Sequence, residues 1–185
     1  MKPNKIALTF LLSAILWGCS QEKIVELPLT LQNGYGPFKM GFAGMRIVMD
    51  KVGYKSYPFQ GEEFTTKAAI SLESLNGKYV FLDFWAEWCA PCIAEFPHLK
   101  ELYSKTDRTK FEIIGIAGQS TPNGIKRLIE QHEITWSQIL SDDIVKMYGI
   151  TSFPTTILLD TEGFIIAKDL RGKELEEKIL SLIKK

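Results

Sequence analysis

Residues 80–92 read Val80-Phe-Leu-Asp-Phe-Trp-Ala-Glu-Trp-Cys89-Ala-Pro-Cys92, an apolar run that ends in two cysteines spaced two residues apart. The apolar run, the short turn and the proline predict a buried strand that leads into a helix. Cys89 then lies at the helix N-terminus, where backbone N–H groups and the helix dipole favour a thiolate. Cys92, one turn further on, is placed to attack a mixed disulfide formed on Cys89. The stretch therefore predicts a dithiol–disulfide redox site.

The composition is that of a soluble globular protein. The 185 residues suffice for one domain with a sizeable core and an extension. Lysine and arginine number 22, as do aspartate and glutamate, so the formal net charge is zero. This balance gives no electrostatic signature of a polyanionic partner, and we expect no nucleic-acid binding.

The N-terminus predicts export. Lys2 and Lys5 precede an apolar stretch, residues 6–17, that is too short to span a bilayer comfortably, and Gly18-Cys19 follows. This arrangement resembles a bacterial lipoprotein signal over residues 1–19, with cleavage before Cys19 and lipid attached to Cys19. Trp17 stands where such signals carry a small residue, so an ordinary cleaved signal or an uncleaved anchor is the alternative. All of these alternatives export the domain, and the lipoprotein signal places it in the cell envelope, anchored to a membrane and facing the periplasmic or extracytoplasmic side.

The three cysteines divide into one for lipid and two for the CxxC pair. A purely structural disulfide is the competing interpretation of that pair. Two cysteines that close so tight a loop remove little chain entropy, which makes stabilisation a weak reason for them. A metal site would need more ligands than one CxxC and two scattered histidines provide, so we expect no metal and no other cofactor.

Residues 20–61 form a predicted tether followed by a β extension. Apolar residues alternate on both sides of a glycine-containing break, which predicts a β-hairpin over residues 38–49. The hairpin either packs on the main domain or offers a partner surface, since Met- and Tyr-rich faces adapt to binding. Tyr54, Tyr57 and Phe59 suggest one more extended segment.

The remaining residues, 62–185, alternate strand and helix patterns. Strands are expected at 79–85, 111–117, 134–140, 155–159 and 164–168. Helices are expected after Pro91, after the N-cap Thr121, after Ser141 and at the C-terminus. This order predicts an α/β fold with a central mixed sheet flanked by helices.

The segment from Asp83 to Cys92 resembles the active-site segment of the thioredoxin superfamily, in particular its exported, membrane-anchored TlpA/ResA-like branch. Glu95 and Pro97 match the Glu-x-Pro of that branch, and residues 148–156 resemble the segment that carries the cis-proline of the fold. The likeness covers residue 70 to the C-terminus. The usual Ala-Pro-x-Phe opening of the branch has no recognisable counterpart here.

The resemblance implies a thioredoxin-like fold and a thiol–disulfide oxidoreductase with Cys89 as nucleophile and Cys92 as resolving thiol. It makes Pro154 the cis-proline and the backbone of Phe153 the docking edge for an extended substrate segment. Phe153 replaces a smaller or branched residue. Trp88 is expected on the exposed rim and Pro91 beside the substrate, while Trp85 packs beneath.

Asp83 is an acid inside an apolar strand, so it should hold its proton abnormally tightly if it is buried. Its expected role is general base and acid for Cys92. A satisfied structural carboxylate or a solvated strand end is the alternative. Glu95 either tunes the site or only adds charge to the helix surface, and His98 and His132 are taken as ordinary helix residues.

These features predict a reductase for disulfides of exported proteins, with a possible place in cytochrome c maturation. Its partners would be disulfide-containing exported proteins and a thiol electron donor in the membrane, with the membrane itself reached through lipid. We expect a monomer. A disulfide oxidase or isomerase is the alternative within the same chemistry, and a binding module that has lost turnover is the alternative outside it.

Overall fold

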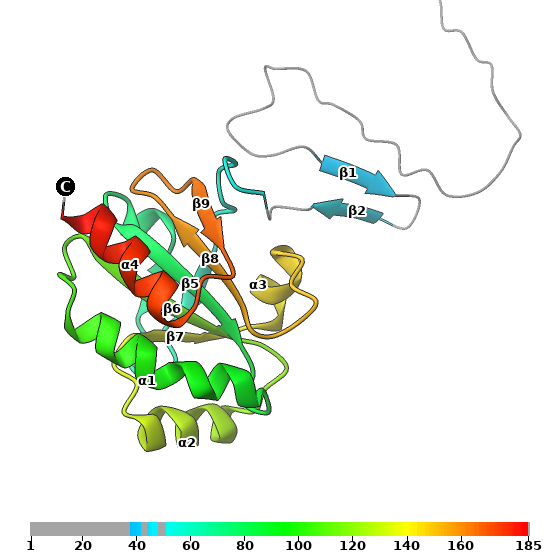
Figure 1. Cartoon of the computed structure of the whole chain (residues 1–185). Helices are drawn as coiled ribbons and strands as arrows, with labels where there is room; N and C mark the ends of the chain where they lie inside the picture. Colours follow the sequence, from blue (N-terminus) through cyan, green and yellow to red (C-terminus); the bar gives the residue numbers. More distant parts are fainter. Residues whose placement is uncertain (1–37, 42–43, 48–50, 185) are drawn as a thin grey trace, which may run out of the picture.

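The computed structural model describes residues 38–41, 44–47 and 51–184 of the chain. Within these ranges a central sheet has the strand order β7-β6-β5-β8-β9 (Figure 1). Strands β5, β6 and β7 are parallel, whereas β8 and β9 run antiparallel to their neighbours. The strands are β5 (Tyr79–Trp85), β6 (Phe111–Ala117), β7 (Ser137–Leu140), β8 (Thr155–Leu159) and β9 (Ile165–Lys168). The mixed sheet confirms the predicted fold class.

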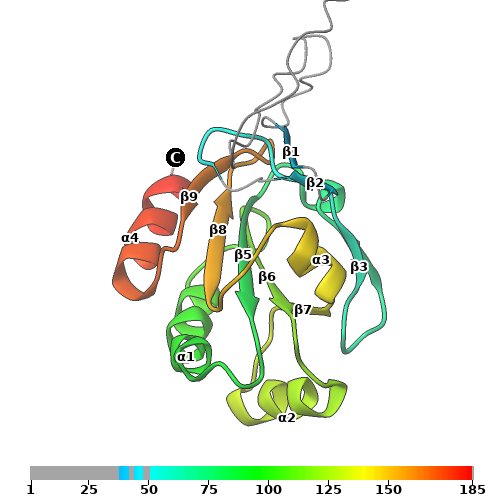
Figure 2. The same ribbon diagram turned by 90° about the vertical axis from the view of Figure 1, so that its right-hand side faces the viewer.

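Helices cover both faces of this sheet (Figure 2). Those of the described chain are α1 (Ala90–Ser104), α2 (Pro122–His132), α3 (Asp142–Met147) and α4 (Gly172–Ile183). One hydrophobic core joins the sheet to α1, α2 and α4, and a second joins the opposite face to α3. The predicted N-caps are confirmed: Thr121 Oγ1 accepts the N–H of Gly124, and Ser141 Oγ accepts the N–H of Ile144.

The alternation of side chains along β5 decides where its one acid lies. Val80, Leu82 and Phe84 belong to the core under α3. Successive side chains of a strand point to opposite faces. Asp83 therefore shares the other face with Trp85, the face that α1 covers.

A polar contact fixes the end of β5 immediately before the cysteines. Trp85 Nε1 donates a hydrogen bond to Oε1 of the buried Gln138 at 2.9 Å. The Gln138 amide lies where a Cβ on Gly115 would be, since an ideal Cβ there would come 2.1 Å from Oε1. Glycine at position 115 thus allows Gln138 on β7 to reach across β6 to Trp85.

The N-terminal side of the described chain contains two antiparallel pairs. Strands β1 (Phe38–Gly41) and β2 (Gly44–Ile47) form the predicted hairpin, and β3 (Gln60–Glu62) pairs with β4 (Ala69–Ser71). A short 3-10 helix, η2 (Glu73–Leu75), follows β4.

Residues 51–59 attach to the edge of the sheet through backbone hydrogen bonds. The N–H of Gly53 donates to the carbonyl of Ile165 at 2.7 Å, and the N–H of Ser56 donates to Gly163 at 2.8 Å. The aromatics of this segment suggest an extended stretch, and its backbone forms a bridge between Lys55 and Phe164 without becoming a strand of the sheet. The predicted domain boundary at residues 61 and 62 stays a prediction.

The signal, the tether and Cys19 lie outside the described residues. No helix of the part that the structure describes is long and apolar enough to cross a membrane.

Candidate active site

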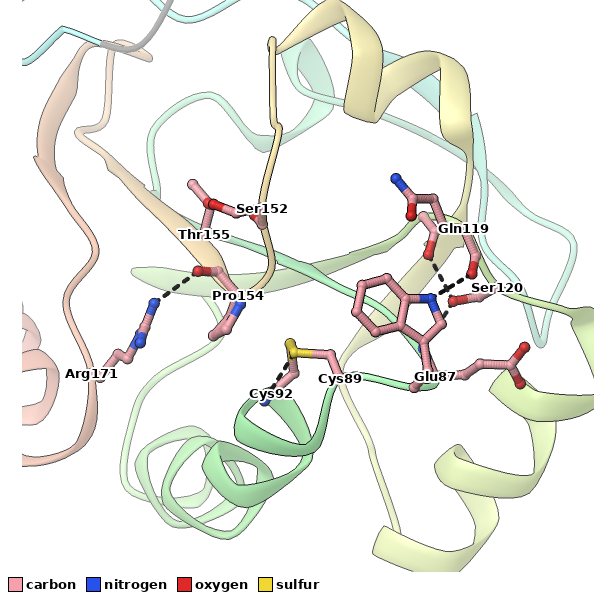
Figure 3. Close-up of a disulfide and its surroundings, with 11 residues drawn as sticks. Glu87, Cys89, Cys92, Gln119, Ser120, Ser152, Pro154, Thr155 and Arg171 are labelled. Atoms are coloured by element: carbon pink, nitrogen blue, oxygen red, sulfur yellow. Dashed lines mark hydrogen bonds between the residues drawn. A yellow bond between two sulfur atoms is a disulfide. The ribbon is translucent and has the colours of Figure 1, made fainter.

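Cys89 and Cys92 form a disulfide at the start of α1, with 5.3 Å between their Cα atoms (Figure 3). Cys89 is the N-cap residue, and its Sγ accepts a hydrogen bond from the N–H of Cys92 at 3.3 Å. Both residues are buried, Cys89 with 3% and Cys92 with 1% of its surface exposed. The helix N-terminus and this N–H group would both stabilise negative charge on Cys89 in the reduced protein.

Asp83 is buried, with 5% of its surface exposed, and lines a small cavity together with Cys92 and Glu95. The interpretation as a solvated strand end is therefore wrong. Burial raises the pKa of Asp83, the Glu95 carboxylate adds to the rise, and the Arg171 guanidinium opposes both effects, so that the pKa is about 7. A carboxyl group with this pKa can accept and return a proton near neutral pH.

Glu95, one turn after Cys92 on α1, contributes more than surface charge. Its Oε2 accepts the backbone N–H of Gly172 at 3.1 Å and so ties α1 to the start of α4. The same carboxylate raises the pKa of Asp83. Its effect on Asp83 favours electrostatic tuning of the site over a role that only adds charge to the helix surface.

The peptide bond between Phe153 and Pro154 is cis, as the resemblance implies. Pro154 lies across the disulfide from α1 in Figure 3 and lines the cavity of Asp83 and Cys92. The ring of Phe153 meets the ring of Trp88 edge to face, with centroids 5.9 Å apart. Trp88 keeps 60% of its surface exposed, and Pro91 is also exposed. The structure brings the seven predicted site residues of the domain to one place: Asp83, Trp88, Cys89, Pro91, Cys92, Phe153 and Pro154.

Backbone and side-chain contacts hold the turn before Cys89. Trp88 Nε1 donates to the carbonyl oxygen of Gln119 at 3.0 Å, and the N–H of Glu87 donates to Ser120 Oγ at 2.9 Å. Glu87 Oε1 in turn accepts the N–H of Thr121 at 2.8 Å, at the N-terminus of α2. The exposed indole is therefore held in one orientation beside the disulfide.

These supporting residues were missed by sequence reasoning. Gln119, Ser120 and Arg171 act through single hydrogen bonds to partners that lie 17 to 33 residues away in the chain. Such bonds leave no periodicity and no motif. The only signal for Glu87 was its position next to the cysteine motif.

A family model for the AhpC/TSA family matches residues 52–168, more than half of the chain. The chain belongs to the AhpC/TSA family. The matched region of this AhpC/TSA protein contains both cysteines, Asp83 and Pro154.

Relatives with known names agree with this assignment. The chain is 33% identical over 118 residues to the thiol-disulfide oxidoreductase ResA of Bacillus thuringiensis, covering 63% of this chain and 68% of the relative. The ResA of Bacillus subtilis is 28% identical over 165 residues, which cover 86% of this chain and 90% of that protein.

A solved structure gives the same picture. The thioredoxin domain of a thiol-disulfide oxidoreductase from Bacteroides vulgatus matches with a TM-score of 0.67 and 31% identity, over 72% of this chain and 98% of that one. With the CxxC pair closed as a disulfide, the chain is a thiol–disulfide oxidoreductase.

The raised pKa of Asp83 predicts a pH-dependent gain in stability for Asp83→Asn. In wild type the folded state holds a proton that the unfolded state releases above about pH 4, so stability is full below that pH and falls as pH rises to about 7. A shift of about 3 units corresponds to at most ~4 kcal/mol. The variant cannot ionise at this position. Its free energy of unfolding relative to that of wild type should therefore rise across this window and stay constant above it.

Urea unfolding of the oxidised proteins between pH 4 and 8 measures this difference in free energy. Asp143→Asn, which removes an exposed carboxylate from α3, is the matched control and should follow wild type. A pH-independent difference between Asp83→Asn and wild type would show that Asp83 ionises as an ordinary carboxyl group.

Proposed function

We propose that this chain reduces disulfides of exported proteins, with Cys89 as nucleophile, Cys92 as resolving thiol and Asp83 as proton acceptor. The observation that carries the proposal is the placement of Cys92 and the buried Asp83 in one cavity, below a Cys89 that caps the helix. The Cys89 thiolate attacks one sulfur of the substrate disulfide and releases the other as a thiolate. A mixed disulfide between Cys89 and the substrate results.

Resolution completes the transfer of two electrons. Cys92 gives its proton to Asp83 and attacks Cys89 Sγ, which expels the second substrate sulfur as a thiolate. The substrate leaves as a dithiol after taking up protons, and the enzyme keeps the Cys89–Cys92 disulfide. A thiol donor in the membrane must then return two electrons before the next cycle.

The docking of the substrate follows from the cis-proline segment. An extended segment pairs with the backbone of Phe153, while the exposed Trp88 and Pro91 border it. The ring contact between Trp88 and Phe153 makes this border apolar. Such a site accepts unfolded or extended disulfide-containing chains, a class that includes an apocytochrome c.

The reducing direction is tested by the reduction potential of the Cys89–Cys92 couple and by turnover of insulin. We expect a potential well below the ~ −120 mV of the oxidant DsbA, in the range of thioredoxin at ~ −270 mV. The soluble domain with dithiothreitol should reduce insulin faster than its Cys89→Ser variant. Equilibration with glutathione buffers gives the potential, and insulin turbidity gives the rate.

A potential near ~ −120 mV would overturn the reductase assignment in favour of an oxidase. A rate equal to that of Cys89→Ser would instead favour a binding module without turnover. In cells, Cys92→Ser should accumulate mixed disulfides through Cys89, and these would identify the substrates.

The proposal places the enzyme on the outer side of a membrane through lipid on Cys19. It is supported by the positive residues, the short apolar stretch and the cysteine of residues 1–19. Cells fed a radiolabelled fatty acid should label the wild-type chain and leave Cys19→Ala unlabelled. Equal labelling of both would contradict the anchor.

A further inference from the structure

Arg171 is an exposed residue that the mechanism above does not use. It precedes α4 with an extended backbone and makes no side-chain cap for that helix. Its side chain instead crosses to the cis-proline, where Nη2 donates a hydrogen bond to the carbonyl oxygen of Pro154 at 2.8 Å (Figure 3). A hydrogen bond from a charged donor is stronger than one between neutral groups.

This bond holds the segment that is proposed to receive the substrate. The carbonyl oxygen of Ser152, which precedes the cis peptide bond, accepts a hydrogen bond from Thr155 Oγ1 at 2.9 Å. The backbone of Phe153 lies between these two attachments. Loss of the Arg171 hydrogen bond would release the Pro154 end of the segment. The Ser152 end would keep its hydrogen bond from Thr155.

Arg171 also lines the cavity that contains Asp83, Cys92 and Glu95. Two charged groups act on Asp83 there: the Glu95 carboxylate from α1 and the Arg171 guanidinium from the connection before α4. The neighbour from β8, Thr156, is uncharged. The guanidinium lowers the pKa of Asp83 against the larger effect of burial.

We propose that Arg171 is a positioning residue, which fixes the docking backbone of Phe153 relative to the Cys89–Cys92 pair and adds positive charge to the cavity beside Cys92. The proposal rests on the proposed function, because it assumes that substrate docks along Phe153. Arginine suits the task because its planar guanidinium directs several donors, whereas lysine presents a compact charge.

Two substitutions separate the hydrogen bond from the charge. Arg171→Gln removes the charge, and Arg171→Lys retains it without the guanidinium geometry. Lys173→Gln is the matched control, because Lys173 lies two residues further along the chain with 87% of its side chain exposed. Its Nζ lies 3.6 Å from Oε1 of Glu177. Insulin and a small aromatic disulfide serve as substrates, with dithiothreitol as the electron donor.

We expect Arg171→Gln to raise the KM for insulin ~3–10-fold and to leave the KM for the small disulfide unchanged, because the small disulfide has no chain to dock. The acidic limb of the kcat profile should move to higher pH, since Asp83 then holds its proton more tightly. Arg171→Lys should restore the pH profile and recover the insulin KM only in part. Lys173→Gln should match wild type in each measurement.

An insulin KM of Arg171→Gln equal to that of Lys173→Gln would overturn the proposal. An equal rise of KM for both substrates would overturn it as well, because a damaged fold and not a displaced docking segment would then explain the loss. Failure of the proposed function gives a different result, since wild type and Lys173→Gln themselves would then not reduce insulin.

Discussion

The site depends on one unfavourable placement, a carboxyl group buried in the central strand beside Cys92. Ionised Asp83 would pay a desolvation cost that the apolar strand around it does not offset. The carboxyl group therefore keeps its proton up to about pH 7. Because this pKa lies near neutral pH, the carboxyl group can receive a proton from a thiol and return it in the same pH range. The stability given up by burying Asp83 is thus linked to the chemistry.

The fold gives the two cysteines different surroundings. Cys89 caps α1 and receives the N–H of Cys92, so the helix N-terminus favours its thiolate. Cys92 lies further inside and lines the cavity of Asp83. The Cys89 thiol is therefore suited to attack an external disulfide, and the Cys92 thiol is suited to give its proton to Asp83. The spacing and the resemblance predict the same division of roles, which stays a prediction that these different surroundings support.

The sequence predicts the elements that are buried on both faces best. Strands β5 and β6 have the bounds that their apolar runs predict, and Thr121 and Ser141 cap helices as expected. The edge of the sheet is harder, because the strand expected over 134–140 begins only at Ser137. Pro58 lacks a backbone donor, and the extended segment suggested by Tyr54, Tyr57 and Phe59 bridges to Phe164 at Lys55 without forming a strand.

The residues of the candidate site also differ in how well the sequence predicts them. The cysteines, Asp83 and the cis-proline have a recognisable order in the chain, whereas Gln119 and Arg171 act through hydrogen bonds with backbone carbonyls. Every residue has a backbone carbonyl, so no residue type or spacing in the sequence indicates such a hydrogen bond. The local pattern determines which residues react, and the tertiary structure determines how they are held.

The most direct test of this account is the titration of Asp83 itself. The chemical shift of its carboxyl carbon, followed by NMR in the oxidised protein and assigned with Asp83→Asn, reports the proton on that group alone. The account predicts a midpoint at about pH 7. A midpoint near the ordinary value of 3.8 would contradict it, because a carboxylate with that pKa is too weak a base to take the proton of the Cys92 thiol near neutral pH.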